Sequence, residues 1–217
     1  MAKGKIIIVS GFSGTGKGTV INEVMSRTPD RYAFSVSATT RPPRPGEIHG
    51  KDYYFVDEIE FERMIIEKEL LEHTRYNYNY YGTPKAPVQR MLSEGKSFIL
   101  DIEVEGMHQV TSNIDGAMTA FLVPPSFEAL LERLRGRGTE TADQIRTRLG
   151  RAVQEAAFAC EYGAVIENAD IKSCAGELEA YIATGVQDES VRQKNLILSQ
   201  EICEAIKRFI KQGELSS

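Results

Sequence analysis

A glycine-rich run that holds a lysine carries the clearest chemistry in this chain. Residues 11–19 read GFSGTGKGT, with an apolar stretch at 6–10 before them and a helical pattern from Gly16 to about Ser26 after them. A strand, a glycine-rich turn and a helix start direct backbone N–H groups at an anion, and the lysine adds a mobile positive charge for the outer phosphates. We expect a nucleoside triphosphate to bind Gly11, Ser13, Gly14, Thr15, Gly16, Lys17, Gly18 and Thr19.

One position in this loop departs from the usual pattern. Ser or Thr normally follows the lysine and places a hydroxyl on Mg²⁺. Here that position is Gly18, and the hydroxyl comes one residue later, at Thr19. Because Mg²⁺ commonly keeps several water ligands, the loss of one protein hydroxyl need not abolish binding. We expect Mg²⁺ to accompany the triphosphate without a direct protein ligand, with Thr19 and Asp101 as candidates to reach it through water.

Composition limits the class of protein. The chain has 217 residues and a net charge of −5, which gives no basic footprint for nucleic acid. No apolar run is long enough to span a membrane, and an apolar strand begins too close to the N-terminus to follow a signal peptide. The three cysteines show neither metal-ligand nor disulfide spacing. These features predict a cytoplasmic protein without nucleic-acid or membrane partners.

Four apolar runs predict the core of the fold. They lie at 6–10, 97–102, 119–123 and, more briefly, 164–166. Their hydrophobicity is continuous rather than alternating, which is typical of parallel strands covered on both faces. Helical segments lie between the runs, as βαβ units require. The pattern predicts an α/β fold with a three-layer, parallel-sheet core of the phosphate-loop type.

A segment of different character, residues 37–94, separates the first two runs. It begins with a proline-rich loop at 40–46, which must be extended. Aromatic and polar pieces follow at 53–55 and 77–82, and a helical pattern covers 58–67. We expect an inserted lobe.

A second insertion, at 126–157, is helical and rich in arginine. A helix is predicted at 126–135, and the glycine-bracketed segment 136–138 follows it. Thr141 and Gln144 then form a capping box that opens another helix. We expect this hairpin to act as a lid.

The last segment, residues 186–217, reads as an amphipathic helix. Apolar residues repeat at helical spacing, at Leu198, Ile202, Ile206, Phe209 and Ile210. The helix either packs on its own core or also contacts another subunit, which would make the protein a homo-oligomer.

Arg41 and Arg44 stand three residues apart on the proline-stiffened loop. A rigid guanidinium fork binds a phosphate bidentately at low entropy cost, so the pair suits a second phosphate group. A solvated basic loop is the alternative for these two residues taken alone.

Together these pieces make the chain resemble the guanylate kinases. The resemblance runs from about residue 5 to residue 181, and its motifs follow the family's order. Besides the glycine-rich run, the matching segments are 37–46, GKDYYF at 50–55, Leu71-Glu72, NYYGT at 79–83, LDI at 100–102 and Gly136-Arg137-Gly138.

The resemblance implies a domain organisation and a reaction. A domain at 1–185 would comprise a core (1–36, 95–125 and 158–185), a GMP-binding lobe (37–94) and a lid (126–157), with a helical extension at 186–217. The implied reaction transfers the γ-phosphoryl group of ATP to GMP or dGMP, giving ADP and GDP. Mg²⁺ would accompany ATP.

The resemblance also implies an acceptor site. The GMP phosphate would be held by Arg41, Arg44, Tyr53 and Tyr81, with Glu47 orienting the arginines. The base would be read by Ser37 and Glu72, with help from Thr83 and Asp101. Guanine offers N1–H and its 2-amino group side by side, so one carboxylate accepts from both, whereas adenine would leave a desolvated Glu72 without donors.

Lid arginines would complete the catalytic set. Arg133, Arg137 and Arg148 resemble the family's arginines that neutralise charge on the transferring group. The implied catalytic residues are Lys17, Arg41, Arg137 and Arg148, and Asn168 joins the ATP site on its adenine side. No general base is required, because a phosphate is already an anionic nucleophile.

Several positions depart from the family pattern. Besides Gly18, these are Glu103, Glu105 and the segment Asn168-Ala169-Asp170, which lacks its middle acid. Two alternatives stay open. Gly18-Thr19 resembles adenylate kinases, which would make AMP the acceptor. A non-catalytic binding module is the other alternative, although such modules tend to lose the loop lysine that this chain keeps.

Overall fold

A computed structural model describes residues 4–34, 36–76, 78–136 and 141–212. The chain divides into two compact units, each discontinuous in sequence. The first unit holds Met1–Ile7 and Thr28–Ala117, and the second holds Ile8–Arg27 and Met118–Ser217. The predicted lobe therefore belongs to the first unit, and the predicted lid belongs to the second.

A five-stranded sheet has the order β2-β7-β1-β8-β9. Its strands are β1 (Ile6–Gly11), β2 (Tyr32–Phe34), β7 (Ser97–Asp101), β8 (Met118–Val123) and β9 (Ala164–Glu167). β2 pairs with β7 and β8 pairs with β9, both in parallel. All residues of β1 and β8 are buried, as expected of strands covered on both faces. The predicted α/β fold and its four parallel-type strands are confirmed, and only the short β2 was missed.

The first unit also holds a four-stranded sheet with the order β4-β3-β6-β5. Its strands are β3 (Ala38–Thr39), β4 (Tyr54–Phe55), β5 (Leu70–Tyr76) and β6 (Asn79–Pro84). β6 is antiparallel to both β3 and β5, whereas β3 and β4 are parallel. The helices of this unit are α2 (Glu58–Ile66), α3 (Lys85–Ser93) and α4 (Val104–Asn113).

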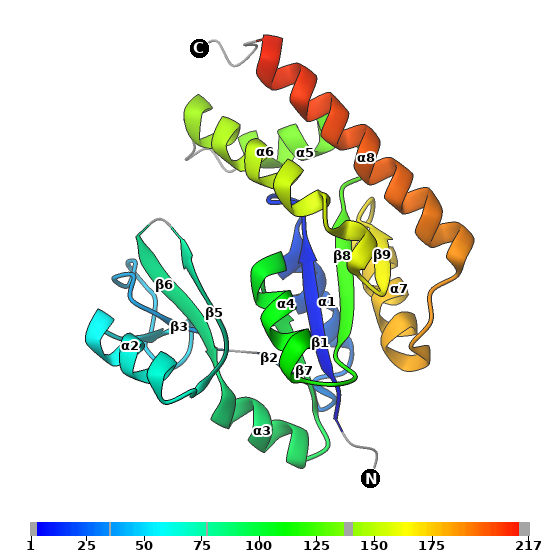
Figure 1. The fold of residues 1–217 in the computed structure, drawn as a ribbon. Helices are drawn as coiled ribbons and strands as arrows, with labels where there is room; N and C mark the ends of the chain where they lie inside the picture. Colours follow the sequence, from blue (N-terminus) through cyan, green and yellow to red (C-terminus); the bar gives the residue numbers. More distant parts are fainter. Residues whose placement is uncertain (1–3, 35, 77, 137–140, 213–217) are drawn as a thin grey trace. The chain divides into compact units, whose positions relative to one another are not determined.

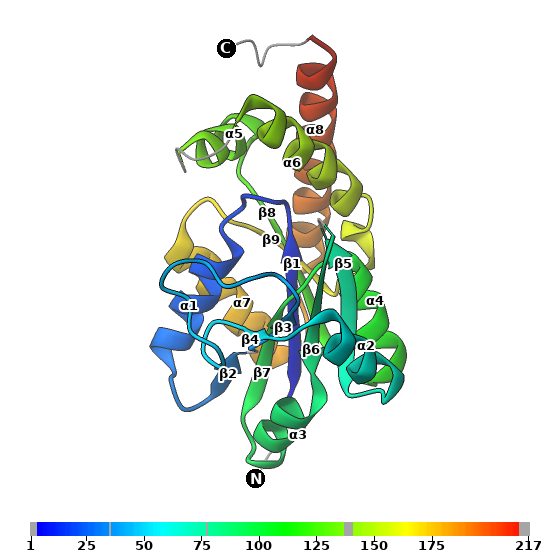
Figure 2. The ribbon, with the colours of Figure 1, turned by 90° about the vertical axis from the view of Figure 1, so that its left-hand side faces the viewer.

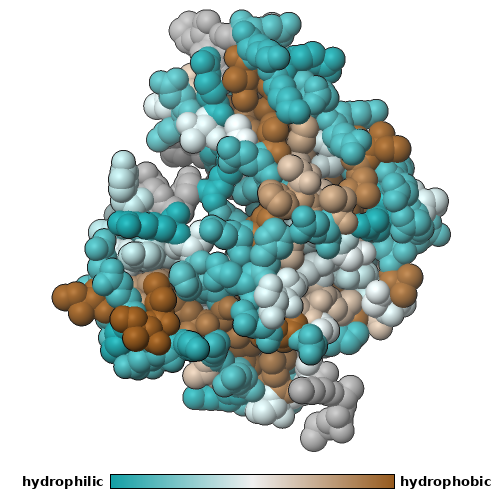
Figure 3. Space-filling view, viewed as in Figure 1, coloured by the Kyte–Doolittle hydropathy of each residue, from teal (hydrophilic) through white to brown (hydrophobic). Residues whose placement is uncertain are grey.

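α2 covers the four-stranded sheet with one face and exposes the other (Figure 1). Phe61 is fully buried and stacks on Tyr80 of β6, with ring centroids 5.1 Å apart. Ile59 and Ile66 point to solvent with 81% and 79% of their surface exposed. Figure 3 shows the resulting hydrophobic area over α2, at the left of the view. The helix thus buries one apolar face on the sheet and also carries apolar residues on its exposed face.

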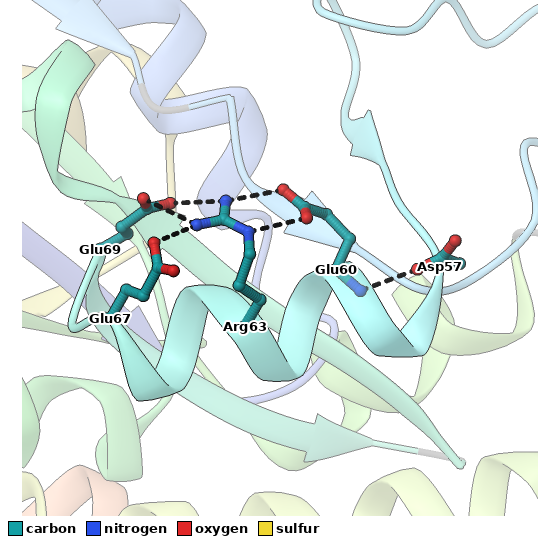
Figure 4. Close-up of polar contacts among 5 residues, drawn as sticks. All are labelled: Asp57, Glu60, Arg63, Glu67 and Glu69. Carbon is teal, nitrogen blue, oxygen red and sulfur yellow. Dashed lines mark hydrogen bonds and ion pairs between the residues drawn. The ribbon is translucent and has the colours of Figure 1, made fainter.

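An ion-pair cluster closes the turn from α2 into β5 (Figure 4). Arg63 donates to Glu60 at 2.8 Å, to Glu69 at 3.0 and 3.1 Å, and to Glu67. Lys68 lies within this turn and takes a left-handed φ of 56°. The hydrogen bonds from Arg63 hold the pKa of Glu60 and of Glu69 below the usual value. One guanidinium thus joins the end of the helix to the start of the strand.

The second unit holds the predicted helices and one, α7 (Ile171–Thr184), that was not predicted. The others are α1 (Lys17–Arg27), α5 (Phe127–Arg135), α6 (Ala142–Ala156) and α8 (Glu189–Gln212), with a short 3-10 helix at Ala159–Glu161. Figure 2 shows α1 and α7 side by side. The predicted capping box is confirmed, because Thr141 Oγ1 accepts from the N–H of Gln144 while Gln144 Oε1 accepts from the N–H of Thr141. Nowhere in the described residues does a helix combine the length and apolar character needed to cross a bilayer.

α8 packs onto its own unit and runs along α6 (Figure 1). Ile202 and Ile206 are buried, as the helical spacing predicts. Polar side chains bind its start to β9, the last strand in the sheet order. The amide of Gln187 accepts from the N–H of Val165 at 2.8 Å and donates to its carbonyl at 2.7 Å, and Asn195 donates to the same carbonyl at 2.8 Å. Packing on its own core is confirmed, and a second-subunit contact stays a prediction.

Candidate functional site

The phosphate loop, residues 11–19, turns between the end of β1 and the start of α1. Gly14 and Gly16 take φ values of 96° and 93°, which side chains disfavour. α1 begins at Lys17, and the N–H groups of its first turn have no acceptors within the helix. These groups and the helix dipole favour an anion at this point. The structure therefore builds the loop where the sequence predicts it.

Lys17 and Glu155 bring opposite charges to the loop. Lys17 Nζ donates to the carbonyl oxygen of Gly11 at 3.1 Å. Glu155 lies on α6, with its Oε1 3.3 Å from Arg151 Nε. Burial raises the pKa of Glu155, and the charges of Lys17 and Arg151 partly oppose that rise. Glu155 was not predicted, because its four-residue spacing from Arg151 is equally typical of surface ion pairs.

Three predicted triphosphate residues contact the loop directly. Arg148 Nε donates to Ser13 Oγ at 3.0 Å. Arg133, on α5, donates to the carbonyl oxygens of Thr15 at 3.0 Å and of Asn168 at 2.9 Å. Asn168 is buried, and its Nδ2 donates to the carbonyl of Thr15 at 2.7 Å. These bonds hold the shape of the loop, and contacts of the same residues with a bound triphosphate stay a prediction.

The metal side of the loop is open. A Cβ added at Gly18 would meet no atom within 4 Å, and Thr19 is exposed. Among the described residues, no three His, Cys, Asp or Glu side chains are grouped to hold a metal ion. Position 18 is thus open to solvent, and a Mg²⁺ ion held there mainly through its water ligands stays a prediction. Arg137, a predicted lid arginine, lies outside the described residues.

The first unit holds Arg41 in a fixed orientation. Its Nη2 donates to both carboxylate oxygens of Glu47, at 2.8 and 2.9 Å, and its guanidinium lies 5.3 and 5.8 Å from the ring centres of Tyr53 and Phe55. The bond with Arg41 holds the pKa of Glu47 below its usual value. Glu47 also accepts from the backbone N–H of Arg44 at 2.7 Å, while the Arg44 side chain is exposed. The predicted orienting contact of Glu47 with Arg41 is present in the structure.

A pocket around Glu72 gathers most of the predicted acceptor residues. We call it the Glu72 pocket. Its lining residues are Ser37, Tyr53, Glu72, Thr74, Tyr81, Gly82, Asp101, Ile102 and Glu103. Thr83 adds the fourth of the residues predicted to read the base, because its Oγ1 donates to Glu72 Oε1 at 2.6 Å. Arg41, Arg44 and Glu47 do not line this pocket. Residues far apart in sequence thus meet within the first unit.

Glu72 is a buried carboxyl group, and hydrogen-bond donors from a ligand would stabilise its ionised form. Only 4% of its surface is exposed. Burial raises its pKa to about 7, although the hydrogen bonds from Thr83 oppose the rise. A buried carboxylate is stabilised by additional hydrogen-bond donors. The pocket therefore favours a ligand that presents N–H groups to Glu72.

A phosphate loop, which lies in the second unit, and a pocket with a buried carboxyl group, which lies in the first, are the features expected of a phosphate-loop nucleoside monophosphate kinase. Comparisons with known proteins agree. The sequence model described as guanylate kinase matches residues 3–184. A guanylate kinase of a Nostoc species is 44% identical over 176 residues, which cover 81% of this chain and 88% of the relative. That of Clostridium tetani is 40% identical over 201 residues, covering 93% and 96% of the two chains.

A solved structure shows the same likeness. The crystal structure of guanylate kinase from Anaplasma phagocytophilum has a TM-score of 0.68 and 29% identity, and the match covers 90% of this chain and 95% of that one. The chain belongs to the guanylate kinase family.

Proposed function

We propose that this chain transfers the γ-phosphoryl group of ATP to GMP or dGMP, giving ADP and GDP or dGDP. Glu72 carries the proposal. Its carboxylate is buried, one oxygen accepts from Thr83, and the other lies against the glycine at position 106 of α4. Guanine would supply N1–H and its 2-amino group to this carboxylate. Ser37, in the same pocket, suits the O6 acceptor of guanine.

Adenine is the poorer ligand for this pocket. It has neither N1–H nor a 2-amino group, so it would bury Glu72 without new donors. A buried polar group that loses its partners rejects a ligand more strongly than a shape mismatch does. The order Gly18-Thr19 resembles adenylate kinases only at the position that would contact the metal, and this position does not determine which acceptor base binds.

The chain's own residues would supply positioning and positive charge. The phosphate loop and Lys17 would hold the triphosphate, while Arg41, Arg44, Tyr53 and Tyr81 would hold the acceptor phosphate. An oxygen of that phosphate forms the new bond to the γ-phosphorus as the bond to the β,γ-bridging oxygen breaks and ADP leaves. No proton must move first. Arg137 and Arg148 would offset the charge that spreads over the transferring group.

Mg²⁺ would neutralise charge on the triphosphate oxygens. Its candidates for indirect contact are Thr19 and Asp101, each through water. The open space beside Gly18 supports a metal that the protein holds mainly through water and phosphate oxygens.

Acceptor preference tests the proposed function. We expect kcat/KM for GMP to exceed that for AMP by at least about 10³-fold, because AMP leaves Glu72 unpaired. ADP release is measured with both nucleotides in parallel at saturating ATP and Mg²⁺. Faster turnover of AMP would assign the chain to adenylate-type chemistry, and no turnover of either would favour a binding module.

Gly18→Ser is expected to lower the Mg²⁺ concentration for half-maximal activity about threefold or more. The new hydroxyl would enter open space at the usual metal position and replace one water ligand. Gly18→Ala is the matched control, because it also replaces the glycine but adds no hydroxyl. Equal Mg²⁺ dependence of the two variants would show that position 18 does not face the metal.

A further inference from the structure

The strand that carries Glu72 is irregular where Glu72 lies. Along β5 and β6, Leu70 is opposite Pro84, and His73 is opposite Gly82. Three steps on β5 therefore match two steps on β6, which places an extra residue between Leu70 and His73. Glu72 belongs to this irregular segment. The regular pairing with β6 is interrupted here, so contacts on the other edge of β5 also bear on where the carboxylate lies, beside the bond from Thr83 to Glu72 Oε1.

Gln109, on α4, binds β5 on its other edge. Its Oε1 accepts from the N–H of His73 at 3.0 Å, and its Nε2 donates to the carbonyl oxygen of His73 at 2.7 Å. β5 is the last strand in its sheet order, so no further strand of the described residues pairs there. One side-chain amide therefore makes the two bonds that a residue of a neighbouring antiparallel strand would make. His73 directly follows Glu72, so the backbone is anchored right after the irregular segment.

The same face of α4 contacts the neighbours of His73. A Cβ added at Gly106 would lie 2.8 Å from Glu72 Oε2, so the absent side chain makes room for the carboxylate. Thr74 Oγ1 donates to Glu105 Oε2 at 2.9 Å. Positions 105, 106 and 109 of one helix thus meet three consecutive residues of β5. Of these contacts, only the one from Gln109 binds the backbone.

We propose that Gln109 is a positioning residue that sets the place of the Glu72 carboxylate by holding the backbone of β5 at His73. This rests on the proposed function, because guanine is taken as the ligand of Glu72. Gln109 does not line the Glu72 pocket as the described residues define it, so it acts through the strand and not on the ligand. Its effect is therefore confined to how well Glu72 meets the base.

Replacement of Gln109 by methionine tests the proposal. Methionine has a similar length but makes neither bond, so KM for GMP is expected to rise about tenfold while KM for ATP stays within about twofold. The telling measurement uses IMP, which lacks the 2-amino group of guanine. A displaced carboxylate loses its second contact, so the preference for GMP over IMP is expected to fall about fivefold.

His73→Ala is the matched control, because Gln109 binds the backbone of His73 and the variant keeps both bonds. It is expected to retain the wild-type GMP preference. If Gln109→Met unfolds below the assay temperature, Gln109→Glu replaces it. That variant keeps the acceptor for the His73 N–H but loses the donor to the His73 carbonyl. The preference for GMP over IMP is again expected to fall.

An equal rise in KM for GMP and IMP, or no change in either, would overturn the positioning role. Glu72→Gln separates this failure from that of the proposed function. If Glu72→Gln raises KM for GMP while Gln109→Met does not, only the positioning role falls. If Glu72→Gln also leaves GMP unaffected, the assignment of guanine to the Glu72 pocket falls with it.

Discussion

Replacement of Lys17 by alanine is expected to lower kcat at least about 10³-fold without unfolding the protein. Lys17 is the first residue of α1, and its side chain donates to the carbonyl oxygen of Gly11 within the phosphate loop. It supports no part of the hydrophobic core, so its charge serves the anion that the loop would bind. Glu155 would lose a nearby positive charge, so its pKa, already raised by burial, would rise further.

Steady-state assays with ATP and GMP, together with a thermal melt, measure this outcome. Lys172→Ala is the matched control, because Lys172 is an exposed lysine in the first turn of α7, another helix of the same unit. The control is expected to keep wild-type kcat. A Lys17→Ala variant that turns over at near the wild-type rate would contradict the role of the loop in catalysis.

The second large effect concerns Glu72. Glu72→Gln is expected to raise KM for GMP about 10²-fold, because a neutral amide accepts poorly from two donors and turns its own N–H groups toward one of them. KM for ATP should change little. Glu62→Gln, at an exposed position of α2 outside the Glu72 pocket, is the matched control. An unchanged GMP dependence in Glu72→Gln would remove this residue from base recognition.

The pH dependence separates the charge of Glu72 from its shape. Since its pKa is about 7, roughly a tenth of the carboxyl groups are ionised at pH 6 and roughly nine-tenths at pH 8. KM of the wild type for GMP should therefore fall about tenfold over this range relative to Glu72→Gln. The phosphate of GMP titrates near pH 6 in both assays, so the ratio of the two proteins isolates Glu72.

A rise in pH should strengthen GMP binding but lower the free energy of unfolding of the wild type. The folded protein holds the proton of Glu72 up to about pH 7, whereas an unfolded chain releases it near 4.5. Stability is therefore lost as the pH rises between these values, and the free energy of unfolding of Glu72→Gln should exceed that of the wild type at pH 8 by up to roughly 3 kcal/mol. The difference should vanish below pH 4.5. Urea denaturation at both pH values measures it.

Sequence was sufficient where the determining interactions are local. The capping box joins Thr141 to a residue three positions away, and the pattern alone identifies it. Continuous apolar runs likewise identified β1 and β8, because strands buried on both faces leave no room for polar alternation. Within the Glu72 pocket, the family resemblance brought together residues that no local pattern links, such as Ser37 and Asp101.

Sequence was insufficient where side chains act over long separations. Gln109 binds a residue 36 positions away, and Arg133 binds Thr15 across 118 positions. Neither contact leaves a periodic or compositional trace, since each depends on how whole elements pack. Glu155 shows the same limit, because only the packing of α6 brings it to the loop. The sequence analysis named Arg133 but not its contact with Thr15, and it named neither Gln109 nor Glu155.

The side-chain amides on two outer strands also bear on how the protein avoids aggregation. β5 and β9 each end a sheet, and an open strand edge is a template onto which another extended chain can add. Gln109 saturates the N–H and the carbonyl of His73, and Gln187 does the same for Val165. A glutamine side chain ends the row of backbone hydrogen bonds at that residue, because it leaves no free N–H and carbonyl there for an added strand. Gln187 lies beyond residue 184, where the family match stops, so the segment before α8 occupies a backbone N–H and a carbonyl of β9 that an added strand would need.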